Sequence, residues 1–148
     1  LDGTNGFTLS GVASATGISV SSAGDVNADG IDDFLVGCHY AGNTGAAYLL
    51  FGKVTDTDGD FAATIDLGDL DGSDGFVFRG INTSDNAGFA VHSAGDVNGD
   101  GFDDILIGAR AGDPSGSNSG ETYLVFGGAD ILALYDEADG TSDGGINL

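Results

Sequence analysis

The sequence predicts an all-β protein built as two four-stranded antiparallel blades of the β-propeller type. Short apolar runs are bounded by Gly, Asn and Asp throughout, and 28 of the 148 residues are glycine, which indicates many strands joined by tight turns. The chain also repeats itself, so that residues 1–69 and 70–148 form two copies of one unit. Several strands are apolar at every position, which favours sheets covered on both faces, as in stacked blades.

The repeat is visible in three places. Segment 1–7, Leu-Asp-Gly-Thr-Asn-Gly-Phe, matches segment 70–76, Leu-Asp-Gly-Ser-Asp-Gly-Phe. An acidic loop and a Tyr-Leu-x-Phe-Gly strand also recur, the loop at 25–33 and 96–104, and the strand at 48–52 and 123–127. Self-similarity of this kind signals a repeat architecture with small insertions between its strands.

The strands follow from runs of β-branched and aromatic residues between turn residues. In the first unit they are expected at 6–11, 18–23, 33–37 and 47–52, and in the second unit at 76–80, 89–94, 104–108 and 121–127. The runs without polar interruption are 34–36, 48–51, 105–107 and 123–126, and for these both faces are expected to be buried. The pattern also allows one short helix over 129–138.

The two acidic loops carry the most specific pattern in the chain. Each places oxygen-bearing side chains at positions 1, 3, 5 and 9 of nine residues, with a glycine at position 6 that allows a sharp turn through positive φ. Together with the carbonyl of position 7 they supply five or six oxygens, close to the number that calcium takes. The predicted calcium ligands are Asp25, Asn27, Asp29, the Ile31 carbonyl and Asp33 in the first loop, and Asp96, Asn98, Asp100, the Phe102 carbonyl and Asp104 in the second.

Three other interpretations fit the loops less well. An EF-hand needs a bidentate Glu at position 12, but that position holds Val36 in one loop and Ile107 in the other. Magnesium is disfavoured because it retains several waters and uses one or two carboxylates. Polar turns rich in Asp, Asn and Gly remain the alternative, and the recurrence of the same ligand types in both units argues against it.

The pattern Asp-x-Asn-x-Asp-Gly-x-x-Asp, preceded by Ala-Gly and followed by an apolar strand, resembles the FG-GAP repeat of integrin α-subunit β-propellers and of many bacterial surface proteins. The Phe-Gly pair of that family is represented by Gly88-Phe89 and, in the first unit, by Gly17-Ile18. Its Gly-Ala-Pro corresponds to Gly37-Cys38-His39 and Gly108-Ala109-Arg110, without the proline. The resemblance implies a propeller fold and a role in adhesion or in the assembly of a surface structure.

Composition limits the partners and the compartment. The formal net charge is -21 with only three Lys and Arg residues, so binding to nucleic acid or to an anionic membrane is not expected. A single cysteine, Cys38, excludes an internal disulfide and is expected to be a small buried residue. No apolar stretch is long enough to insert into a membrane. The chain starts without Met or a signal-peptide pattern, as a mature or excised piece would.

These features predict a calcium-binding extracellular or cell-surface module with two calcium sites, serving structure and adhesion. Two blades are fewer than a propeller needs, so neighbouring repeats of a longer chain or head-to-tail self-association into a ring or filament is expected to complete the fold. A protein or glycan could be the ligand, and no catalytic residues are expected. The alternative is an accessory domain of a secreted polysaccharide-processing enzyme. Further acidic clusters at 56–60 and 136–140 are candidate weak calcium sites.

Overall fold

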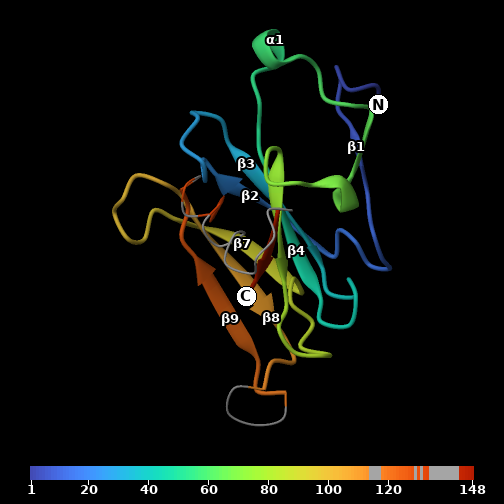
Figure 1. Cartoon of the computed structure of the whole chain (residues 1–148), viewed down its shortest axis with the longest axis vertical. Coiled ribbons are helices and arrows are strands. Elements are labelled where there is room, and N and C mark those ends of the chain that lie inside the picture. The colour runs from blue at the N-terminus through green and yellow to red at the C-terminus, as the bar shows by residue number, and fades with distance from the viewer. Residues whose placement is uncertain (114–117, 129, 131, 134–143) are drawn as a thin grey trace.

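The computed structural model describes residues 1–113, 118–128, 130, 132–133 and 144–148, and this part of the chain is nearly all β (Figure 1). The strands are β1 (Thr8–Ser10), β2 (Ser19–Gly24), β3 (Asp33–Cys38), β4 (Ala46–Leu50), β5 (Thr64–Asp66), β6 (Gly75–Arg79), β7 (Ala90–Gly95), β8 (Asp104–Ala109), β9 (Glu121–Val125) and β10 (Gly145–Asn147). Short helical turns are α1 (Thr55–Asp58) and η1 (Leu67–Asp69). The all-β prediction is confirmed, and most of the helix expected over 129–138 lies outside the described residues.

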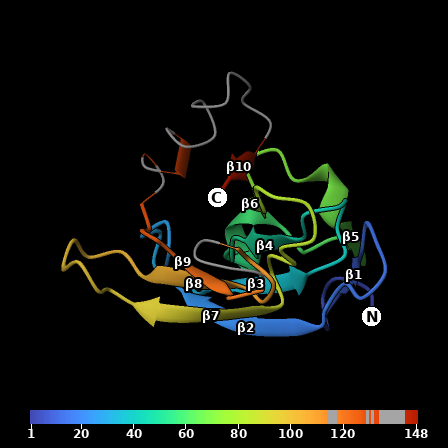
Figure 2. The ribbon, with the colours of Figure 1, turned by 90° about the horizontal axis from the view of Figure 1, so that it is seen from below.

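The strands form two stacked sheets and one smaller pair. The first sheet has the order β10-β6-β4-β3-β2 and the second has the order β7-β8-β9, while β1 pairs with β5. Neighbours are antiparallel except in the β10–β6 and β1–β5 pairs, which are parallel. Figure 2 shows the two sheets lying face to face, with β7 running alongside β2.

The internal repeat seen in the sequence is also a repeat of structure. Strands β1 to β5 have counterparts β6 to β10, and the counterparts pair in the same register. Leu9 of β1 lies opposite Ile65 of β5, as Phe78 of β6 lies opposite Ile146 of β10. The β2–β3 and β7–β8 ladders even share the same irregularity, which falls just before Gly24 in one and Gly95 in the other. Matched strand patterns and turn residues therefore produced matched hairpins.

The repeat boundary and the sheet boundary do not coincide. Strand β6 belongs to the second repeat by sequence, yet it pairs along its whole length with β4 of the first repeat. The first blade is therefore a four-stranded antiparallel sheet β2-β3-β4-β6, extended by β10, in which β6 takes the place expected for the strand at 6–11, and that strand, β1, pairs with β5 instead. The second blade has three strands within the described residues instead of the four expected, because β6 lies in the first blade.

One apolar core fills the space between the blades. Leu35 and Leu49 from the first blade pack there with Ile105 and Ile107 from the second, and all four are fully buried. A second core lies on the opposite face of the first blade, where Val36, Tyr48 and Leu50 pack with Leu67 of η1 and with strands β1 and β5. Among the described residues, none of the helices has the length and apolar character that a membrane crossing requires.

The expectation of burial on both faces holds for the first blade and not for the second. Strands β3 and β4 are covered by the two cores, and β4 is buried at every position. In β8 and β9 the residues facing away from the first blade are partly or largely exposed, among them Leu106 and Leu124. The difference arises because the described part of the chain provides no layer beyond the second blade.

Candidate metal site in the acidic loops

The two sets of predicted ligands lie in the hairpin loops that join β2 to β3 and β7 to β8. Both loops have the same backbone form, with positive φ at position 6, where Gly30 has φ 88° and Gly101 has φ 95°. Position 4 is also left-handed, at φ 56° for Ala28 and φ 78° for Gly99. The expected turn at the position-6 glycine is confirmed, and it folds positions 1 to 5 back on themselves.

Side-chain oxygens of the first loop point to its own backbone. The carboxylate of Asp25 accepts hydrogen bonds from the N–H groups of Asp29, at 3.1 Å, and Gly30, at 2.9 Å. Asn27 Oδ1 accepts from Asp29 N–H at 3.0 Å, and Asn27 Nδ2 donates to Asp29 Oδ2 at 3.0 Å. Asp96, Asn98 and Asp100 make the same set of contacts in the second loop. The structure therefore brings positions 1, 3 and 5 together in both loops.

The aspartates at position 9 act as clamps between strands. Asp33 is buried, and its two oxygens accept hydrogen bonds from Val26 N–H at 2.9 Å and from Gly52 N–H at 2.8 Å. Asp104 does the same for Val97 and Gly127, at 2.8 and 3.0 Å. Each clamp joins the second residue of an acidic loop to a glycine two residues beyond the end of β4 or β9. The sequence pattern predicted position 9 as a ligand and did not reveal this second role.

Burial raises the pKa of the Asp33 carboxyl from its ordinary value of 3.8 to about 6. The two N–H donors lower this pKa, while the negative charges of Asp29 and Asp25 raise it further. In the first loop the negative charges of positions 1 and 5 thus act on the carboxyl at position 9. A divalent cation among them would relieve that repulsion.

The two loops are also bonded to each other. Asp25 N–H donates to Asp103 Oδ2 at 2.9 Å, and Asp103 N–H donates to the Asp25 carbonyl at 3.1 Å. Asp103 stands at position 8 of the second loop and was not among the predicted ligands. Its signal in the sequence is the Asp-Asp pair that ends both loops; in the second loop the first member of the pair, Asp103, reaches the neighbouring repeat.

The donor chemistry of each loop fits a hard cation. A carboxylate offers about four lone-pair sites, and the contacts above use two of those on Asp25. The carbonyls of Ile31 and Phe102 accept no hydrogen bond within the described residues, which leaves them available as predicted. In the conformation described, however, no group of three or more His, Cys, Asp or Glu side chains is gathered closely enough to hold a metal ion among the residues placed. Calcium would therefore require the side chains to rotate inward from their backbone partners.

The remaining sequence candidates make local contacts where they are described. Cys38 is fully buried, as expected, with Thr16 Oγ1 3.2 Å from its sulfur. In the 56–60 cluster, Asp58 accepts a hydrogen bond from Val54 N–H at the start of α1, and the Asp60 carbonyl accepts one from Lys53. The 136–140 cluster lies outside the described residues.

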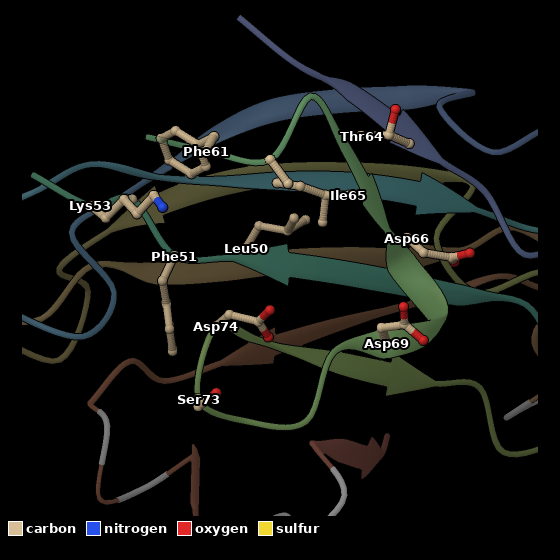
Figure 3. Close-up of a pocket in the computed structure, with 12 residues that line it drawn as sticks. Leu50, Phe51, Lys53, Phe61, Thr64, Ile65, Asp66, Asp69, Ser73 and Asp74 are labelled. Carbon is tan, nitrogen blue, oxygen red and sulfur yellow. The ribbon is translucent and has the colours of Figure 1, made fainter. Parts of the chain in front are cut away.

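A pocket of about 410 Å³ lies between β5, η1 and the β4–β6 edge (Figure 3). Lys53 and Phe61 lie on one side of it and the carboxylates of Asp69 and Asp74 on the other. Burial is the main reason that the pKa of Asp74 is raised, and the nearby Asp71 raises it further. The Phe61 ring is already contacted by Phe7, with centroids 4.6 Å apart, and by Lys53 Nζ, 4.6 Å from its centroid. Phe61 therefore has an aromatic and a cationic neighbour at the rim of this pocket.

The FG-GAP repeat model matches residues 16–50 and 87–125, which together make up half of the chain. The chain belongs to the FG-GAP repeat family. Each match runs through three consecutive antiparallel strands, β2 to β4 in one and β7 to β9 in the other, and contains one acidic loop. FG-GAP repeats are β-propeller blades, which agrees with the stacked sheets described above.

This FG-GAP chain is also similar to integrin alpha pat-2 of Caenorhabditis briggsae, with 35% identity over 95 residues. The aligned region covers 63% of the chain and spans 7% of the length of that relative. The chain therefore corresponds to a small part of the length of that integrin α-subunit.

Proposed function

We propose that this chain is a calcium-stabilised module of an extracellular adhesion protein and is not an enzyme. The observation that carries the proposal is the duplication of one acidic loop in sequence, backbone conformation and hydrogen bonding. Turns kept only for their shape would not need an Asp, Asn, Asp, Asp oxygen set in both copies, since many residues satisfy a turn. The FG-GAP match and the similarity to an integrin α-subunit support the adhesion role.

Calcium would be held by the side chains of positions 1, 3, 5 and 9 and by the position-7 carbonyl of each loop, the ten residues named above. When bound, the ion supplies positive charge among carboxylates that otherwise repel one another. The chain's own residues shape the site: the position-6 glycine allows the loop to turn, and the position-9 aspartate bonds the loop to the segment that follows the neighbouring strand. Calcium binding would thus add to the stability of the hairpin by mass action.

The setting follows from affinity and charge. Extracellular calcium modules bind with dissociation constants on the order of 10⁻⁴ to 10⁻³ M. Sites of this affinity are occupied only where calcium is abundant. A net charge of -21 opposes compaction, and two bound calcium ions would reduce it. A protein or a glycan remains the proposed class of adhesion ligand.

The test is thermal melting with calcium and with a chelator. At calcium concentrations of roughly thirty times the dissociation constant, each site adds about 2 kcal/mol, so two sites should raise the Tm by about 10 °C. Asp29→Asn and Asp100→Asn should each remove about half of this increase, and the double variant nearly all of it. Asp69→Asn removes the same charge from an exposed position outside the loops and should leave the increase intact.

An unchanged Tm of the parent chain on chelation would exclude the calcium sites. Equal losses in Asp29→Asn and Asp69→Asn would show that calcium acts through overall charge and not through the loops. Isothermal titration should independently report two sites, and one in each single variant.

A further inference from the structure

The second blade ends in a strand whose outer neighbour is missing from the described residues. Strand β4 is flanked by β3 and β6, but its counterpart β9 pairs with β8 alone. Strand β1 is the counterpart of β6, and among the described residues it pairs with β5 alone. Within the described residues, β9 thus has an unpaired edge, and β1 is the kind of strand that pairs with the equivalent edge of β4 in the first blade.

We propose that β1 of a second copy of this chain pairs with β9 and completes the second blade, so that copies join head to tail. The register follows from the β4–β6 ladder, in which Tyr48 lies opposite Val77 and Ala46 opposite Arg79. The aligned positions place Tyr123 opposite Thr8 of the second copy, and Glu121 opposite Ser10. The pair β1–β5 would then sit on β9 as the pair β6–β10 sits on β4.

Differences in burial between aligned residues mark the surfaces that would meet. Val26 and Leu49 of the first repeat are 1% and 0% exposed, because the second repeat covers them, whereas their counterparts Val97 and Leu124 are 52% and 44% exposed. On the opposite face, Val91 is 5% exposed where it meets the first repeat, and its counterpart Val20 is 68% exposed. The uncovered apolar residues of the second repeat therefore face outward on one side, and those of the first repeat on the other. Docking in the repeat geometry buries both sets.

The hydrogen bond between the two acidic loops has an aligned donor and acceptor that are not bonded to each other within one chain. Asp103 of the second repeat accepts from Asp25 N–H of the first. Asp32, the counterpart of Asp103, is exposed and its carboxylate accepts no hydrogen bond within the described residues. The N–H of Asp96, the counterpart of Asp25, has no acceptor there either. In the proposed contact, Asp32 of the second copy accepts from Asp96 N–H.

A close backbone approach supplies a third sign of the same contact. A Cβ on Gly88 would come 1.9 Å from the Ala46 carbonyl of the first blade, so only glycine fits there. Its counterpart Gly17 is exposed, and a Cβ there would meet nothing within 4 Å. In the head-to-tail contact, Gly17 would lie against the carbonyl of Glu121 in the preceding copy.

A chain of residues 1–148 contributes two blades, so a ring of four to eight blades assembled from this chain contains two, three or four copies. Sedimentation equilibrium at roughly 100 μM chain, in calcium and at an ionic strength that screens charges beyond about 8 Å, should give such a multiple of the 14.6 kDa chain mass. Gly17→Ala should weaken the association about tenfold or more, through overlap at the contact. Gly59→Ala is its matched control, since Gly59 has nearly the same φ, 79° against 81°, and equal free space. A parent chain that is monomeric at this concentration overturns the proposal, and so do equal effects of the two variants.

The register is tested by disulfide trapping in a Cys38→Ala background, because Ala109 occupies the aligned position in the second repeat. Oxidation of the Ser10→Cys, Glu121→Cys variant should link copies into a ladder that ends at the ring size. Ser10→Cys with Thr122→Cys moves one thiol to the other face of β9, and this variant should give several-fold less product. Similar yields from the two pairs, or no linkage in the first, would contradict the proposed register.

Discussion

At the scale of single residues, the two acidic loops differ at position 4, where both adopt left-handed backbone. The first loop has Ala28 there and the second has Gly99. A left-handed conformation costs an L-residue with a Cβ on the order of 1 kcal/mol, and glycine almost nothing. A Cβ at Gly99 would meet nothing within 4 Å, so packing does not enter the comparison.

Exchanging the two residues should change stability in opposite directions. Gly99→Ala should lower the free energy of unfolding by about 0.5–1 kcal/mol and Ala28→Gly should raise it by a similar amount, because the left-handed strain outweighs the freedom that glycine adds to the unfolded chain. Urea unfolding in chelator measures both without contribution from bound metal. Destabilisation by Ala28→Gly would mean that the left-handed form of that loop does not persist in solution.

At the scale of elements, the position-9 aspartates hold each loop to the strand beside it. Asp33 and Asp104 are buried and each accepts two backbone N–H groups. The position-5 aspartate Asp29 is exposed, and its contacts stay within the loop. Both residue types would be calcium ligands, yet only the clamp carries fold stability without the ion.

This distinction predicts unequal effects in the absence of calcium. In chelator at pH 8, above the raised pKa of Asp33, Asp33→Asn should cost about 1–3 kcal/mol, because one buried N–H loses its acceptor and the other loses a charged one. Asp29→Asn, which keeps an oxygen for Ile31 N–H, should cost less than about 0.5 kcal/mol. Chemical denaturation of both variants provides the measurement, and equal costs would argue against the clamp.

At the scale of the whole molecule, two blades of a strongly negative chain are stacked against each other. The chain carries -21 formal charges, and this repulsion is balanced by the shared apolar core and the inter-loop bonds. Self-repulsion between exposed charges weakens as salt shortens the screening length from about 30 Å at 0.01 M to about 8 Å at 0.15 M.

Sodium chloride should therefore stabilise the chain even when calcium is removed. We expect the Tm in chelator to rise by a few degrees, about 1 kcal/mol or more, between these two salt concentrations. The increase should be the same in the Asp29→Asn, Asp100→Asn double variant, because screening does not use the loops. A Tm that falls with added salt would show that favourable ion pairs outweigh the repulsion.

Much of the local structure could be predicted from particular residues. The Gly30 turn, the strands on either side of it and the buried Cys38 all follow from short-range preferences and from the alignment of the two repeats. The clamp of Asp33 on Gly52 could not be foreseen, because its two ends are brought together by the β3–β4 pairing. The bond from Asp103 to Asp25 depends on how the blades stack, which no single loop encodes.

The sequence by itself determined the all-β class, the duplication and the acidic loops with their oxygen-bearing side chains, because turn chemistry and hydrophobic patterning act over a few residues. The tertiary structure decided that β6 joins the sheet of the preceding repeat, that only the first blade is covered on both faces, and that β9 has no outer neighbour among the described residues. These features arise from strand pairing between segments far apart in the chain, where the register is set by the packing of whole blades and not by any local pattern.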